Sequence, residues 1–152
     1  MQEEHKIILS EVFRNVLMRF AFMFGEKYSK NEMPLENSDC FHAKISFNNN
    51  IHGSLGIMTS SDLCTEMSAN VLGTEMEDDD CSEDAFDTLG ELSNIICGQF
   101  LTSAFGNEII FNLSPPSVSV ADPTEWAELL KSNGSLAFMV DDYPALLYME
   151  IE

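Results

Sequence analysis

The sequence has little positive charge. Seven lysines and arginines stand against 26 aspartates and glutamates, so the formal net charge at pH 7 is −19. A surface with this charge repels the phosphate backbone of nucleic acids and the headgroups of anionic lipids. We therefore expect neither nucleic acid nor a membrane among the partners of this protein.

Long apolar runs and paired cysteines are also missing. No stretch approaches the roughly 20 apolar residues that a membrane helix needs. The first residues are polar, unlike the basic start of a secretory signal. The four cysteines form no C-x-x-C pair, so we expect reduced thiols. Together these features predict a cytoplasmic protein.

Motifs for metal binding and covalent catalysis are absent too. The three histidines lack the spacing of metal ligands. In the acidic run 75–80, an EF-hand register that begins at Asp78 fails, because Glu83 and Leu89 replace the obligatory glycine and glutamate. There is no Ser-His-Asp or Cys-His constellation and no glycine-rich phosphate loop. We expect no metal site, and a protease, kinase or nucleotide hydrolase has no support.

The hydrophobic pattern predicts one α+β domain over residues 1–152. The apolar content of 45% suits a single core in a chain of this length. Helical periodicity, strand alternation and turn residues predict a helix 4–27, a hairpin 42–47 and 51–59, a helix 62–72, a central helix that Ser82 caps and that carries the apolar positions 85–100, a strand 109–114 that continues past a break at Val118 and Val120, a short helix or turn at 126–130, and a hairpin 136–140 and 145–151. Ser60 or Ser61 would cap the helix 62–72 and Gly73 would end it, and Asp122-Pro123-Thr124 would start the short helix or turn. Strands and helices do not alternate regularly. This order favours two layers, with long helices packed on a mostly antiparallel sheet.

The predicted central helix has two different faces. Its apolar residues form one core-facing arc, namely Ala85, Phe86, Leu89, Leu92, Ile96, Cys97 and Phe100. The opposite face collects Asp87, Glu91, Asn94 and Gly98, which are spaced four, three and four residues apart. A solvated helix face is the simplest interpretation of this second stripe. However, Gly90 and Gly98 each cost about 1 kcal/mol inside a helix, which favours a surface that another backbone approaches closely.

The residues around this face resemble a known family. Glu91-x-x-Asn94 within GELSNIICGQF, followed by Pro115-Pro116, is similar to the signature of the CheC/CheX/FliY chemotaxis phosphatases. The resemblance continues upstream through Gly53-Ser54-Leu55 and covers roughly residues 40 to 120. The chain has one clear copy of the pair, as CheX does in this family. In the similar segment EVFRNVLMRF, Arg14 occupies the place of the asparagine, which suggests a diverged internal repeat.

The resemblance implies a CheC-like fold and a substrate that is itself a protein. That substrate is a CheY-type response regulator phosphorylated on an aspartate in a magnesium-containing acidic pocket. Asn94 would orient the attacking water, and Glu91 would pair with a lysine of the regulator. Gly90 and Gly98 would permit close approach, and Asp87 would add a contact at the rim. The protein would need no cofactor of its own, since the Mg²⁺ belongs to the regulator.

Two other functions remain open from the sequence. The helix face could dock a response regulator or motor-switch protein without catalysis. Alternatively, Met18 and Phe22 on the second face of the first helix could make the chain an oligomerisation domain. The resemblance also implies a homodimer joined through its sheets, for which the hairpin 136–151 is a candidate.

Overall fold

The computed structural model describes residues 1–33, 40–73 and 81–152, without the side chains of residues 81 and 82. The acidic run 75–80 lies outside the described residues. The described helices are α1 (Glu3–Ala21), α2 (Ser61–Leu72), α3 (Cys81–Phe105) and α4 (Pro123–Lys131). The described strands are β1 (Gly25–Lys27), β2 (Cys40–Asn48), β3 (His52–Ser60), β4 (Asn112–Leu113), β5 (Ser117–Ala121), β6 (Ser135–Val140) and β7 (Tyr143–Ile151).

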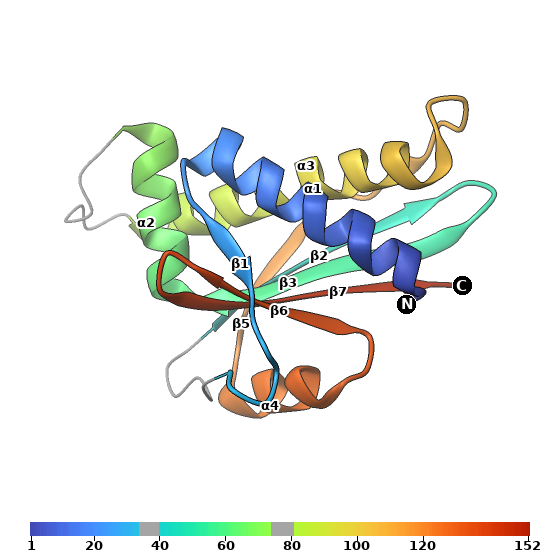
Figure 1. Ribbon diagram of the computed structural model, residues 1–152. Coiled ribbons are helices and arrows are strands. Elements are labelled where there is room, and N and C mark those ends of the chain that lie inside the picture. The colour runs from blue at the N-terminus through green and yellow to red at the C-terminus, as the bar shows by residue number, and fades with distance from the viewer. Residues whose placement is uncertain (34–39, 74–80) are drawn as a thin grey trace.

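The strands form one sheet in the order β1-β6-β7-β3-β2-β4, with β5 also paired to β2. Every pairing described is antiparallel. β4 and β5 follow one another along the same edge of β2: β4 pairs with Phe47 and Asn48, and β5 pairs with residues 40–44. The predicted α+β class and antiparallel sheet are confirmed (Figure 1).

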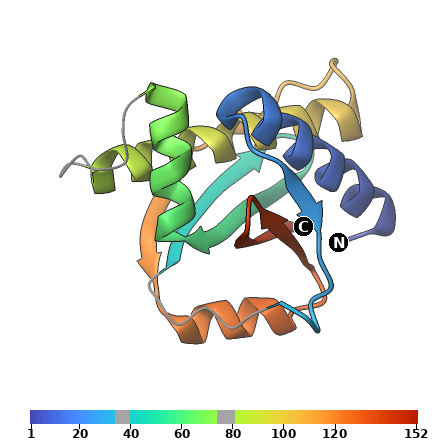
Figure 2. The same cartoon turned by 60° about the vertical axis from the view of Figure 1, so that its left-hand side comes forward.

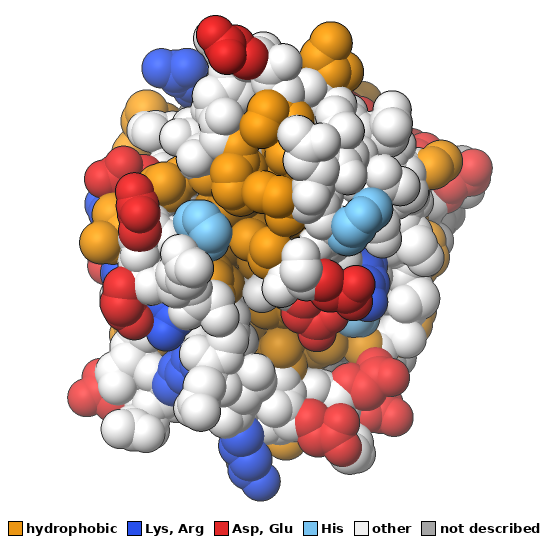
Figure 3. Space-filling view, turned by 90° about the vertical axis from the view of Figure 1, so that its right-hand side faces the viewer, with side chains coloured by type: hydrophobic (Ala, Val, Ile, Leu, Met, Phe, Trp, Pro, Cys, Tyr) orange, Lys and Arg blue, Asp and Glu red, His pale blue; other side chains and the backbone are white. Residues whose placement is uncertain are grey.

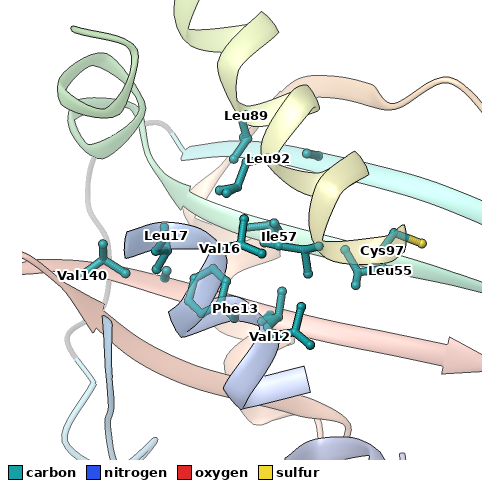
Figure 4. Packing of buried hydrophobic residues seen from close by; sticks show 14 of the residues in the cluster. Val12, Phe13, Val16, Leu17, Leu55, Ile57, Leu89, Leu92, Cys97 and Val140 are labelled. Carbon is teal, nitrogen blue, oxygen red and sulfur yellow. The ribbon is translucent and has the colours of Figure 1, made fainter. Parts of the chain in front are cut away.

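Three helices cover one face of the sheet, and the main core lies between them and the strands. Phe13 and Leu17 of α1, Leu89 of α3 and Ile57 of β3 are all fully buried there (Figure 4). α4 covers the other face, where Trp126 is fully buried in a second cluster (Figure 2). The sheet is therefore packed on both sides, and α4 adds a small layer to the two that the sequence predicts.

The sheet order has an internal symmetry. Exchanging β1 with β5, β2 with β6 and β3 with β7 leaves the order β1-β6-β7-β3-β2-β5 unchanged except for its direction. α1 precedes the first set of strands as α3 precedes the second. This arrangement supports the hypothesis of a diverged internal repeat. In such a repeat, β1 of the first half pairs with β6 of the second half, and β5 of the second half pairs with β2 of the first.

Several predicted end signals are present in the structure. Ser60 is the N-cap of α2, and its Oγ accepts a hydrogen bond from the Leu63 N–H at 3.2 Å. Gly73 ends the same helix in the left-handed region, with φ 68°. Asp122 closes a capping box with Glu125 at the start of α4. These local signals fix where two of the four described helices begin.

The first helix is shorter than predicted. It ends at Ala21 rather than near Lys27, and Phe22 adopts a left-handed conformation with φ 58°. The turn allows Met23 to be fully buried and Gly25–Lys27 to pair with β6. Burial and strand pairing therefore override a helical pattern that contains no breaker before Gly25.

Two predictions about strands also need correction. The strand expected at 109–114 is regular only at Asn112–Leu113, whereas the expected continuation at Val118 and Val120 is present as the longer β5. The hairpin 136–151 does not offer a free edge over most of its length. β7 lies between β6 and β3, and residues 138–140 of β6 pair with β1. The hairpin is thus inside the sheet.

Candidate functional site

α3 supplies the candidate site and is anchored along its length. It packs against α1, α2 and the sheet, and Leu89, Ile96 and Phe100 on its apolar side are fully buried. Near its start, Phe86 meets Phe41 of β2 edge to face, with ring centroids 4.5 Å apart. The predicted core-facing arc is confirmed for this helix. The position of the opposite face relative to the rest of the domain is therefore fixed by packing.

The opposite face carries the predicted polar residues. Asp87 and Glu91 are exposed, and Asn94 and Gly98 are half-buried. Among the described residues, no hydrogen bond or ion pair engages the side chains of Glu91 and Asn94. A carboxylate and an amide, one turn apart on a rigid helix, are thus available to groups of another molecule.

Gly90 does not have the environment that the sequence suggested. It is buried, and a Cβ there would lie 3.3 Å from Cγ of Pro116 and 3.5 Å from Cγ2 of Val118. The close approach at this glycine is made by the double-proline segment of the same chain. Gly90 therefore packs against a segment of its own chain. It also lines a surface hollow with Asp87 and Pro116, so its contact with a partner stays a prediction. The structure also explains why the glycine and the prolines occur together.

Gly98 has the opposite environment. A Cβ there would meet nothing within 4 Å. Gly98 and Asn94 line one surface hollow, together with Ile95, Gln99, Thr102, Ser103 and Leu113. Sequence analysis missed Thr102, although 94, 98 and 102 are spaced by four and therefore share a helix face. Leu113 could not be found from this spacing, because it comes from β4.

The corresponding face of α1 is different. Arg14, which takes the place of Asn94 in the repeat, donates a hydrogen bond from Nε to the carbonyl oxygen of Gly25 at 3.1 Å. This bond ties the side chain to β1. Glu11 and Asn15 are exposed and line a separate hollow with Met18 and Phe24. Within the described chain, the Glu-x-x-Asn pair thus occurs on α3 and has a structural arginine as its counterpart on α1.

Other reactive groups have ordinary structural positions. Cys40, Cys64 and Cys97 are buried and form no disulfide. Burial raises the pKa of the Cys97 thiol to about 12 and the pKa of Cys64 further, so neither is a thiolate at neutral pH. The described residues contain no group of three or more histidines, cysteines or carboxylates that could hold a metal ion. No described helix is long and apolar enough to cross a membrane.

Comparisons with known proteins agree with the fold and with the motif. No curated protein matches the sequence. The chain resembles the crystal structure of the chemotaxis protein CheX from Vibrio vulnificus, with 19% identity, a TM-score of 0.74, and coverage of 98% of this chain and 97% of that one. It also resembles a CheC-like superfamily protein from a Shewanella species, with 24% identity, a TM-score of 0.66, and coverage of 100% and 99%.

A third similar structure is the CheX-CheY-BeF3-Mg²⁺ complex from Borrelia burgdorferi. Its identity to this chain is 17% and its TM-score is 0.65, and the match covers 97% of each chain. The family model described as chemotaxis phosphatase CheX matches residues 41–139, which is more than half of the sequence and includes Glu91, Asn94 and the double proline. The chain therefore belongs to the CheX family of chemotaxis phosphatases.

Proposed function

We propose that this protein hydrolyses the phospho-aspartate of a CheY-type response regulator in the cytoplasm, in chemotaxis or another two-component pathway. The observation that carries the proposal is the pair Glu91 and Asn94 on the outer face of α3. Neither side chain forms a hydrogen bond or ion pair with another described residue. The Borrelia complex adds support, because a CheX there is bound to CheY with beryllofluoride and Mg²⁺. Beryllofluoride has the shape and charge of a phosphoryl group.

The reaction needs little more than a positioned water. An acyl phosphate is already reactive, but in-line attack requires the water oxygen to lie opposite the leaving carboxylate. In the proposed mechanism the side-chain amide of Asn94 orients this water. An amide both donates and accepts hydrogen bonds without titrating, so it can hold the water without acting as a base. A hundredfold acceleration corresponds to about 3 kcal/mol of barrier.

Glu91 would hold the regulator in place. Its exposed carboxylate lies one turn before Asn94 and is suited to pair with a lysine beside the phosphorylated aspartate. Such a pair would also offset the repulsion between an acidic protein and an acidic pocket. Asp87, one turn further back and also exposed, would contact the rim. No cofactor of this chain enters the mechanism, and the Mg²⁺ would be the regulator's own.

The first test is the decay of a phosphorylated CheY-type regulator with catalytic amounts of this protein. We expect the wild type to accelerate the decay. Asn94→Ala should remove most of the acceleration while binding to the beryllofluoride-loaded regulator persists. Glu91→Ala should weaken both binding and turnover, because the anchoring pair is lost.

A matched control is Asn133→Ala, which removes an exposed asparagine from the turn between α4 and β6. This variant should behave as wild type. Unchanged turnover in Asn94→Ala would contradict the water-positioning role. Binding of the regulator without any acceleration of decay by the wild type would instead support the non-catalytic docking module.

A further inference from the structure

The second half of α3 has no charge. From residue 92 to residue 107 the chain contains no lysine, arginine, aspartate or glutamate, although charged residues make up 22% of the whole sequence. At that frequency a stretch of this length would hold three or four charges. Burial accounts for part of this absence, because most of these residues are buried or half-buried, but the exposed residues Gln99, Thr102 and Ser103 are uncharged as well. An exposed, uncharged surface is unusual in a chain with a net charge of −19.

This uncharged surface borders the candidate site on one side. Asn94, Gly98, Gln99, Thr102 and Ser103, here called the neutral strip, line a single hollow. Ile95 and Leu113 complete the same hollow, and the space over Gly98 is open. Glu91 lies at one end of the strip. At the end of the molecule shown in Figure 3, by comparison, apolar side chains gather at the centre, and both acidic and basic side chains lie toward the margins.

The neutral strip matters because of the charge of the proposed substrate. A phosphorylated aspartate in an acidic pocket keeps excess negative charge even with a bound Mg²⁺. Charges interact over about 8 Å at physiological salt, so each carboxylate near the contact that lacks a cationic partner, unlike Glu91 with its proposed lysine, would oppose docking. A basic strip would also be unfavourable, because it would attract the acidic pocket after the phosphoryl group has left. An uncharged polar surface allows close approach and does not hold the product.

We propose that the neutral strip is the surface on which the phosphorylated regulator docks beside its acidic pocket, with Gln99, Thr102 and Ser103 as specificity-determining residues. The inference rests on the proposed function, since it names the docking path to the same site. These residues act on association, whereas Asn94 acts on the water. Their substitution should therefore change KM and leave kcat unaltered.

The test places opposite charges at one position of the strip. Thr102→Glu, Thr102→Lys and the neutral Thr102→Gln are compared by steady-state dephosphorylation at low and high salt. We expect Thr102→Glu to lower kcat/KM about tenfold at low salt and Thr102→Lys to raise it, both through KM. The effects should shrink at high salt, because screening removes them. The same three substitutions at Thr124, exposed on α4, are the control.

Two results would overturn the proposal. One is a kcat/KM that is the same for Thr102→Glu, Thr102→Lys and wild type. The other is an equal, salt-independent loss in all three Thr102 variants, which would indicate shape rather than charge. Affinity for the beryllofluoride-loaded regulator is measured in parallel. A charge-dependent affinity with no turnover by the wild type would support the docking surface and refute the phosphatase activity.

Discussion

At the scale of single residues, Gly90 and Gly98 lie two turns apart on α3 and have different surroundings. Gly98→Ala adds a methyl group that meets nothing within 4 Å, whereas the same change at Gly90 places Cβ 3.3 Å from Pro116. Alanine is favoured over glycine in a helix by about 1 kcal/mol. We expect Gly98→Ala to raise the free energy of unfolding by about that amount and Gly90→Ala to gain less, as measured by urea denaturation.

The Gly98 variant also separates stability from function. If a regulator approaches the helix closely at Gly98, the more stable Gly98→Ala protein should dephosphorylate it more slowly. Loss of turnover together with a gain in stability cannot be attributed to unfolding. A variant that is both more stable and fully active would show that the open space over Gly98 is not used.

At the scale of elements, His42 and Tyr148 connect β2 to β7 across β3. Tyr148 Oη lies 2.7 Å from His42 Nε2, and its ring lies directly over Gly56 of the intervening strand. Burial lowers the pKa of His42 below 6.5, Glu125 opposes this shift and Lys44 adds to it. His42 therefore binds a proton more readily in the unfolded chain than in the folded protein. Its contribution to the free energy of unfolding should be complete above pH 6.5 and should be lost as the pH falls through the pKa of His42 in the folded protein.

Urea denaturation at pH 7 and at lower pH measures this effect. In His42→Gln, which keeps a polar side chain but cannot titrate, the loss of stability on acidification should be smaller. His52→Gln removes an exposed histidine from β3 and serves as the matched control. Equal pH dependence in wild type and His42→Gln would contradict the proposed linkage.

The elements also show how far the sequence determines the fold and the site. The apolar arc of α3 and the caps at Ser60 and Asp122 were predictable, because helical periodicity and capping are local properties. The Glu91/Asn94 pair was found from its motif. The end of α1 could not be predicted, because Phe22 is no helix-stop residue and the burial of Met23 depends on tertiary packing. The contact between Gly90 and Pro116 joins distant segments and could not be deduced from spacing.

At the scale of the whole molecule, the sheet has two edges, one at β1 and one at β4 and β5. Near β1, Met18, Phe22 and Phe24 are exposed, and Phe22 is 71% accessible. Phe22 also has φ 58°, a conformation that costs a non-glycine residue roughly 1 to 2 kcal/mol. A large apolar side chain that is both exposed and strained suggests a contact with another molecule.

We expect this corner to mediate self-association, so Phe22→Glu should convert a wild-type dimer into a monomer in sedimentation velocity. Phe22→Gly should weaken the dimer while raising the free energy of unfolding of the monomer by about 1 kcal/mol, because glycine fits the left-handed turn. Val120→Glu, which adds a charge at an exposed position on β5 at the other edge, should leave the dimer intact.

A wild type that sediments as a monomer, or a Phe22→Glu variant that remains dimeric, would show that β1 and the end of α1 are not the interface. Because Phe22 directly follows α1 and Asn94 lies on α3, the monomeric variant should keep the phosphatase activity proposed for α3.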